Sequence, residues 1–242
     1  MTMLIRGGHI RDLTGDILLR GGRIAAIAET ISPPEDEGCC CVDAHGLTVL
    51  PGLIDAHVRD VPRPGVTAGL HWPDGEGVCT LFTSEMAQSS RFYAILPERY
   101  ADAQLHAHML ELAHEGFLPV CEVQGESACR RMLGMIHSTG VRAILAGLRG
   151  CGALAEALVL AHAPLVADGD ADLLSRLDAS GAEYALSGAF TADTPAVALN
   201  PAHLLGLTDR GFLAPGAAAD IVLCDDAFKP VLTIAAGKIR HE

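Results

Sequence analysis

Hydrophobic positions in the first fifty residues fall in short runs that are separated by glycines or polar residues. In the runs 3–10, 16–29 and 39–50, apolar and polar residues alternate or apolar residues are consecutive, which is typical of β-strands. Gly21 and Gly22 join two apolar runs. Because glycine adopts positive φ at little cost, this junction predicts a β-hairpin. The Pro-rich segment 32–38 predicts a loop.

The pattern between residues 51 and 205 is an alternation of short apolar segments with longer helical ones. Such alternation predicts parallel strands joined by right-handed helical crossovers. The predicted helices are 98–116, 126–140, 152–162, 171–181 and 194–206. The predicted strands are 52–58, 78–84, 91–97, 117–123, 142–148, 163–169 and 183–188.

The last forty residues return to the β pattern, with strands predicted at 219–226 and 230–242 and a hairpin at Gly237-Lys238. β segments at both ends enclose a βα middle. We therefore expect a composite β-domain formed by residues 1–50 and 206–242, and a βα domain formed by residues 51–205.

Composition excludes several classes of partner. Half of the 242 residues are hydrophobic and the net charge is −13, so neither nucleic acid nor an anionic membrane is an expected partner. The opening segment lacks the apolar core of a secretion signal, and the longest apolar run, 152–166, is too short to span a bilayer. Eight cysteines without a paired CxxC motif indicate buried, reduced thiols, and we expect a cytoplasmic protein.

Both ends of the chain resemble a known superfamily. The segments "GGRIAAIAE" and "CVDAHGLTVLPGLIDAHV" resemble the N-terminal β-domain and first barrel strand of amidohydrolases, which are metal-dependent hydrolases. Residues 198–226 and 231–239 resemble the last helix and returning strands of that family. The middle segment 119–166 is similar to the imidazolonepropionase-like branch, and dihydroorotase is a more distant relative.

This resemblance implies an α/β fold, with a (β/α)₈ TIM-like barrel beside a small β-sandwich domain. The span 53–207 is shorter than the roughly 200 residues that a full barrel commonly needs. We therefore expect a contracted or incomplete barrel that has lost elements between its first and fifth strands.

The metal ligands that the resemblance implies are mostly absent. The His-x-His pair of the first strand is here His57-Val58-Arg59, and a guanidinium has no lone pair and repels a cation. No lysine precedes Lys229, so a carbamylated lysine is excluded. The remaining ligand positions carry no histidine or aspartate: the fifth strand has Cys121, Glu122, Gln124 and Glu126, the sixth has Leu148 and Arg149, and the eighth has Ser187, with Asp193 further on.

Substitute ligands are poor candidates. His71 and Asp74, with Cys79 beyond them, are placed on a Gly-rich loop, where solvated polar residues are the commoner case. His106 and His108 are two residues apart on a predicted helix and so point to different faces. Glu122 and Glu126 are either acid–base groups or polar residues at a strand end. Three consecutive cysteines on a strand, Cys39, Cys40 and Cys41, alternate faces and cannot all bind one ion.

Two functions remain open. The first is a non-catalytic amidohydrolase, a pseudoenzyme that binds or assembles with itself or with an active relative and carries no cofactor. The second is an active hydrolase of a small amide or cyclic amide, with zinc held by His57 and catalysis by Asp55 or Glu122. Arg59 and Asp60 at the barrel mouth are candidates for binding a small anionic ligand. The alternative is that Arg59 pairs with Asp55 or Asp60 and fills the former metal site.

Overall fold

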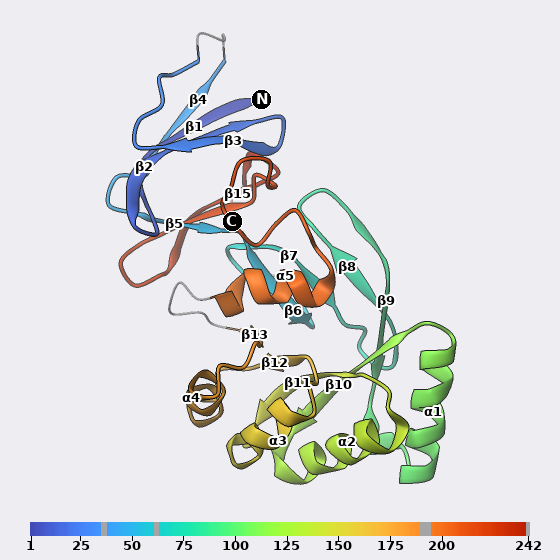
Figure 1. The fold of residues 1–242 in the computed structure, drawn as a ribbon. Coiled ribbons are helices and arrows are strands. Elements are labelled where there is room, and N and C mark those ends of the chain that lie inside the picture. Colours follow the sequence, from blue (N-terminus) through green and yellow to red (C-terminus); the bar gives the residue numbers. More distant parts are fainter. Residues whose placement is uncertain (35–37, 61–62, 189–194, 241–242) are drawn as a thin grey trace.

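The computed structural model describes residues 1–34, 38–60, 63–188 and 195–240, and in this part of the chain the strands form two eight-stranded sheets (Figure 1). The loop predicted at 32–38 and the end of the last hairpin lie partly outside the described residues. None of the described helices has the length and apolar character needed to cross a membrane.

The first sheet combines strands from both ends of the chain. Its order is β16-β15-β14-β5-β1-β2-β3, and β4 pairs in parallel with β1. Gly21 and Gly22, with φ of 59° and 78°, form the predicted turn between β2 and β3. The strands are β1 (Thr2–Ile10), β2 (Leu13–Arg20), β3 (Arg23–Ala28), β4 (Cys40–Asp43), β5 (Thr48–Pro51), β14 (Ile221–Cys224), β15 (Pro230–Ala235) and β16 (Lys238–Arg240).

This sheet folds back over its own core and so builds the predicted sandwich. Met3, Ile17 and Ile24 from one half pack in one cluster with Ile221 and Ile234 from the other half. A bridge between Arg23 and Ala218 links the β3 edge to the segment before β14. The division of the chain at residues 50 and 205 stays a prediction.

The second sheet has the order β6-β7-β8-β9-β10-β11-β12-β13 and forms the predicted TIM-like barrel, nearly closed. Residues from all eight strands join one buried cluster, which runs from Ile54 and Ala56 of β6 to Ala185 of β13. The strands are β6 (Leu53–Val58), β7 (Val66–His71), β8 (Gly77–Phe82), β9 (Ala87–Ile95), β10 (Leu118–Gln124), β11 (Ile144–Arg149), β12 (Leu165–Ala167) and β13 (Ala185–Leu186).

The first half of the barrel departs from the predicted parallel arrangement. β8 runs antiparallel to β7 and β9, because the connections 72–76 and 83–86 are too short for a crossover. The sequence analysis also missed β7. Its residues Thr67, Ala68 and Gly69 are small, and a Cβ at Gly69 would lie 2.2 Å from the Asp55 carbonyl oxygen. β7 can therefore lie this close to β6 only if position 69 is a glycine.

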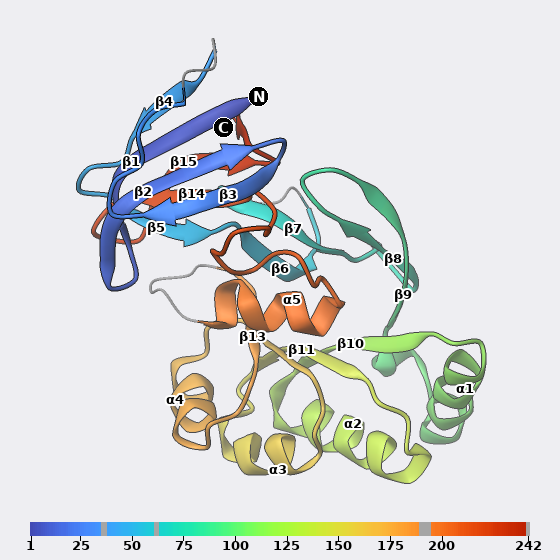
Figure 2. The ribbon, with the colours of Figure 1, turned by 45° about the horizontal axis from the view of Figure 1, so that its top comes forward.

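Helices cover the second half of the barrel, as predicted, and no α-helix lies between β6 and β9 among the described residues. Figures 1 and 2 show α1–α4 on one side of β10–β13 and α5 on the other. The helices are α1 (Asp102–His114), α2 (Gly125–Thr139), α3 (Ala155–Leu160), α4 (Ala171–Ala179) and α5 (Leu199–Leu205), with short 3₁₀ turns η1 (Pro97–Arg99), η2 (Gly152–Leu154) and η3 (Pro195–Val197).

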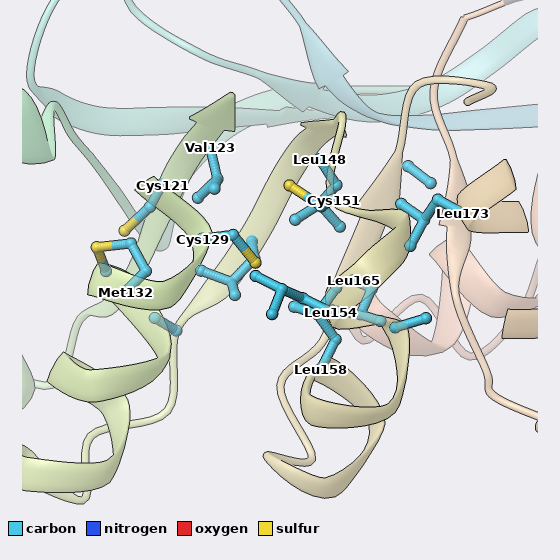
Figure 3. Packing of buried hydrophobic residues seen from close by; sticks show 14 of the residues in the cluster. Cys121, Val123, Cys129, Met132, Leu148, Cys151, Leu154, Leu158, Leu165 and Leu173 are labelled. Carbon is cyan, nitrogen blue, oxygen red and sulfur yellow. The ribbon is translucent and has the colours of Figure 1, made fainter. Parts of the chain in front are cut away.

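The helical layer packs on the barrel through leucines and sulfur-containing side chains (Figure 3). Leu173 and Leu177, one turn apart on α4, are fully buried, and the Asp170 side chain caps this helix by accepting the Leu173 N–H. On α2, Cys129 and Met132 face the sheet. α5 contributes Ala202 and Leu205 to the barrel cluster, on the side of the sheet opposite α1–α4 (Figure 2).

A buried ion pair ties the two sheets together. The Arg210 guanidinium donates to Asp220 at 2.8 Å, and their side chains are only 4% and 2% exposed. Arg210 also donates to Ser84 in the β8–β9 turn, while Asp220 accepts the Ala236 N–H of the first sheet. The pair therefore holds the barrel hairpin against the terminal sheet.

Replacing Arg210 by alanine should lower the free energy of unfolding by about 3–5 kcal/mol, because Asp220 would stay buried without its partner charge. The Arg176–Asp172 pair on α4, with side chains 56% and 63% exposed, provides the matched control. Arg176→Ala should cost no more than about 0.5 kcal/mol. Urea unfolding measures both values, and equal losses in the two variants would contradict the structural role of Arg210.

The cysteines divide into a buried and an accessible group. Burial raises the pKa of the Cys79 and Cys129 thiols to about 12. The prediction of buried thiols is confirmed for Cys79, Cys121, Cys129, Cys151 and Cys224, whereas Cys41 is exposed and Cys39 and Cys40 are half-buried.

A disulfide-exchange reagent should therefore label Cys39, Cys40 and Cys41 in the native protein and reach the other five only after denaturation. Peptide mapping by mass spectrometry identifies the labelled positions. Rapid native labelling of Cys121 or Cys129 would show that the helical layer is not packed as described.

Candidate functional site

A cavity of about 590 Å³ lies at the carboxyl ends of β6, β11, β12 and β13. This is the end of a barrel where ligand sites are built, because the loops that follow the strands converge there. Its volume suits a small molecule. The lining residues are Asp55, His57, Val58, Arg59, Asp60, Arg63, Arg149, Asp168, Ser187 and Gly188.

Arg59 is held by three neighbours, Glu122, Pro73 and Trp72. One terminal nitrogen donates to Glu122 Oε2 at 2.6 Å, and the other donates to the Pro73 carbonyl at 3.0 Å. The guanidinium carbon lies 5.2 Å from the centre of the Trp72 ring, which adds a cation–π contact. The prediction that Arg59 pairs with Asp55 or Asp60 is therefore wrong. The partner comes from β10, across the barrel, which strand spacing along the sequence does not reveal.

Glu122 uses both carboxylate oxygens. Oε2 accepts from Arg59, and Oε1 accepts from Gln124 Nε2 at 2.8 Å. Burial alone raises the pKa of Glu122, but the hydrogen bonds from Gln124 and Arg59 outweigh it. With the added charge of His57, they hold the pKa below its usual value of 4.5. Glu122 is thus an ionised partner of Arg59 and a poor proton donor.

His57 lies between two carboxylates without a hydrogen bond to either. Its Nε2 is 3.8 Å from Glu122 Oε2, and its Nδ1 is 3.9 Å from Asp168 Oδ1. The side chain is only 8% exposed, and its ring centre lies 4.4 Å from that of Trp72. Nε2 is buried without a hydrogen-bond partner among the described residues. A buried ring nitrogen without a hydrogen-bond partner costs free energy, so His57 is held here by its surroundings.

Asp55 holds the two edges of the barrel together. Its Oδ1 accepts the Ser187 hydroxyl at 2.8 Å and the His57 backbone N–H at 2.9 Å. Ser187 follows β13, so this contact joins the last strand of the barrel to the first. Asp55 lines the cavity, but its main contacts are structural. Asp193, the other candidate at this strand end, lies outside the described residues.

Some of the lining residues are sequence candidates and others are not. His57, Asp55, Arg59 and Asp60 line the cavity, and Glu122 reaches it through Arg59, while their roles in binding or catalysis stay predictions. Asp168 and Arg63 were missed. Asp168 lies within the predicted strand 163–169 and directly follows β12, so its place at the carboxyl end of a barrel strand is a detectable signal. Arg63 follows a connection with no regular pattern, so no signal pointed to it.

The other sequence candidates lie elsewhere. His71 ends β7 rather than lying on a loop, so that prediction is wrong. His108 on α1 stacks on Tyr100, and Glu126 on α2 pairs with Arg130. Cys40 packs against the core of the first sheet.

A zinc ion, which the family resemblance implies, does not fit these donors. Glu122 is already bound by Arg59 and Gln124. Within the described ranges, no group of three or more His, Cys, Asp or Glu side chains is arranged to hold a metal ion. Arg59 places a fixed positive charge next to His57, which opposes a second cation at that position.

Comparison with known proteins gives local sequence matches and a match of the whole fold. No family model matches the chain. A dihydroorotase from Elusimicrobium minutum is 34% identical over 93 residues, which cover 36% of this chain and 18% of the relative. An N-acyl-D-glutamate deacylase from Alcaligenes xylosoxydans xylosoxydans is 34% identical over 91 residues, which cover 34% and 17%. The chain thus matches less than a fifth of the length of these relatives.

Solved structures match the fold over the whole chain. An amidohydrolase from Thermotoga maritima superposes with a TM-score of 0.79 at 15% identity and covers 99% of this chain and 100% of its own. A prolidase in complex with N-methylphosphonate-L-proline gives a TM-score of 0.69 at 12% identity, with both chains fully covered. The finer assignment to the imidazolonepropionase-like branch stays a prediction. The local sequence matches and the fold together support the amidohydrolase superfamily as the family that this chain resembles.

Proposed function

We propose that this chain binds a small amide or cyclic amide at the barrel mouth and does not hydrolyse it by metal catalysis. The observation that carries the proposal is the Arg59–Glu122 ion pair at 2.6 Å. It places a protein cation beside His57, where the family places a metal ion. A guanidinium can neutralise Glu122, but it cannot convert water into a nucleophile as a metal does.

The amide class of ligand is inferred from the relatives and from His57. The matched proteins are named as a dihydroorotase, deacylases and an allantoinase. In this chain the unpaired Nε2 of His57 offers one donor or acceptor to an amide group, depending on the tautomer. The Trp72 ring, whose centre lies 4.4 Å from that of His57, would exclude water from that contact.

We propose that this role includes assembly of the chain with itself or with an active relative, as the sequence suggested. The first half of the barrel supports this, because β8 and β9 carry no covering helix among the described residues.

An active hydrolase is the second candidate, favoured by the orphan Nε2 of His57 next to two carboxylates. In that case His57 would hold zinc with non-family ligands, and Asp55 or Glu122 would act as the acid or base. The present contacts weigh against it, because Asp55 is bound to Ser187 and Glu122 is bound to Arg59.

Zinc titration separates the two functions. The wild-type chain should bind no stoichiometric zinc, whereas Arg59→His should increase zinc affinity at least tenfold, because it removes a cation, supplies a nitrogen donor and frees Glu122 (about 1.4 kcal/mol per tenfold). Competition with a chromophoric chelator measures the affinity. Arg130→His, which makes the same change beside Glu126 on α2, is the control.

One zinc per wild-type chain, lost in His57→Ala together with amidase activity, would establish the active hydrolase instead. Unchanged zinc affinity in Arg59→His would show that Arg59 is not what opposes the metal.

Removing the Arg59 charge should also change how stability depends on pH. Arg59→Ala should lower the free energy of unfolding by about 1–2 kcal/mol near pH 7, a value reduced for the partial exposure of both side chains. The folded-state pKa of Glu122 is depressed, so its contribution is present above the unfolded pKa and is lost as pH falls through the folded pKa.

The difference between wild type and Arg59→Ala should therefore shrink as the pH falls from about 7 to below the usual carboxylate pKa. Urea unfolding across this range measures it. Arg130→Ala, which removes a more exposed partner of Glu126, should show a smaller difference throughout. A difference that stays constant with pH would mean that Arg59 stabilises the fold by packing rather than by charge.

A further inference from the structure

We infer that a second cavity, at the amino ends of the barrel strands, binds a small organic phosphate that has an apolar body. This cavity has a volume of about 460 Å³ and lies at the end of the barrel opposite the mouth. The proposed function makes no use of it, so the inference goes beyond that function and does not depend on it. The cavity is called the amino-end cavity below.

The amino-end cavity lies where four neighbouring parallel strands begin. Leu118 is the first residue of β10, and Leu165 is the first residue of β12. Arg142 lies two residues before β11, and Tyr184 lies one residue before β13. A further wall comes from α5 through Leu204. Residues from five separate segments therefore surround one volume of a size that suits a small molecule.

The strand register brings basic side chains close together at this end. Leu145 pairs with Leu165, so counting back three residues along each chain places Arg142 level with His162. Neighbouring strands lie about 4.8 Å apart, which puts these two side chains within reach of one ligand group. Arg91 lines the same cavity from β9, two strands away from Arg142.

These basic groups keep their hydrogen-bond donors available. Within the part of the chain that the structure describes, the side chains of Arg142 and His162 make no hydrogen bond or ion pair. Arg91 has only a ring contact there, with its guanidinium carbon 5.7 Å from the centre of the Phe92 ring. The chain has 30 acidic residues against 17 lysines and arginines, so three unpaired basic groups at one cavity indicate a site for an anion.

The amino-end cavity differs from the mouth in its acidic residues. Among its described lining residues the one acid is Glu183, and Glu183 Oε1 lies 3.3 Å from Nδ1 of His203 on α5. The mouth is lined by three acids, Asp55, Asp60 and Asp168. An anion would therefore meet less repulsion at the amino-end cavity than at the mouth.

His162 is held at the cavity by a constrained backbone. It follows α3 with φ of 49°, and its N–H donates to the Val159 carbonyl at 3.0 Å. Glycine is the usual residue in this left-handed position after a helix, because it adopts positive φ without steric cost. The chain instead keeps an imidazole here, and backbone strain of this kind concentrates at functional sites.

The remaining walls are apolar and fixed by packing. Leu158 and Leu165 are buried, and Leu204 packs against the barrel cluster. The Tyr184 hydroxyl donates to Asp178 at 2.9 Å, and burial together with this bond raises the pKa of Tyr184 to about 12. The phenol is therefore neutral and does not repel an anion. Apolar walls beside basic groups suit a ligand with an apolar body and one charged end.

A phosphate monoester fits the basic groups better than a carboxylate does. A carboxylate has two oxygens in one plane, which a single guanidinium can satisfy. A phosphate monoester carries a charge of about −1.5 to −2 at neutral pH and offers three acceptor oxygens. It can therefore accept hydrogen bonds from Arg91, Arg142 and His162, which approach from three separate segments.

Calorimetric titration of the full chain with four probes tests the inference. Phenyl phosphate has both an apolar body and a phosphate, inorganic phosphate lacks the body, phenol lacks the charge, and benzoate replaces the phosphate by a carboxylate. Phenyl phosphate should bind at least ~10-fold more tightly than each of the others. Arg142→Ala should weaken phenyl phosphate binding at least ~10-fold and leave the fold intact, because the Arg142 side chain has no partner within the described residues.

Arg149→Ala is the matched control. Arg149 lies at the opposite end of the same strand and its side chain is 73% exposed, so this variant should leave phenyl phosphate affinity unchanged. His162→Ala is a second variant and should reduce the affinity severalfold.

Three results would overturn the inference. Binding that is lost in Arg149→Ala and kept in Arg142→Ala would place the phosphate at the mouth. Benzoate binding as tight as that of phenyl phosphate would contradict the phosphate assignment. A wild-type chain that binds no phenyl phosphate would refute the site itself, and none of these results bears on zinc affinity, which tests the proposed function.

Discussion

The hydrogen bond between Ser187 and Asp55 is the contact on which the functional end of this protein depends. It joins the strand ends of β13 and β6, the two edges of the barrel sheet, and Asp55 also fixes the His57 backbone. The cavity is lined from both sides of this seam. If the edges separated, His57 and Arg59 would no longer share a cavity with Asp168 and Arg149. A buried carboxylate with two donors is well suited to this task, because breaking either bond would leave it unsatisfied.

The barrel is nearly closed although its first half lacks helices in the described chain. Short connections force β8 to run antiparallel to β7 and β9. Two other contacts support this half of the barrel. α5 packs Ala202 and Leu205 against the barrel cluster, and the buried Arg210–Asp220 pair ties the hairpin side to the terminal sheet. The helical half of the barrel thus supports the cavity, and the half without helices contributes His57 and Arg59 to its lining.

Charge within the site is organised by arginines. Arg59 neutralises Glu122, while Arg149 lies within 4.0 Å of Asp168 and stays largely exposed. One arginine is therefore paired inside the barrel and the other lies largely exposed at its mouth. The difference has a geometric origin, since the Arg59 guanidinium lies over the Trp72 ring, whereas a register shift between β10 and β11 skips Leu148 and pairs Arg149 with Gln124.

The sequence by itself determined the superfamily, the terminal β-sheet, the helical layer and the place of His57, because these follow from local motifs and from hydrophobic periods. It also showed that Arg59 replaces a histidine. Only the tertiary structure decided that Arg59 pairs with Glu122, that β8 is antiparallel and that Arg149 enters the cavity. The Arg59–Glu122 pair depends on which strands face each other across the barrel. The direction of β8 depends on loop length, and the position of Arg149 depends on a one-residue bulge. Loop length and a bulge leave no periodic signal in the sequence.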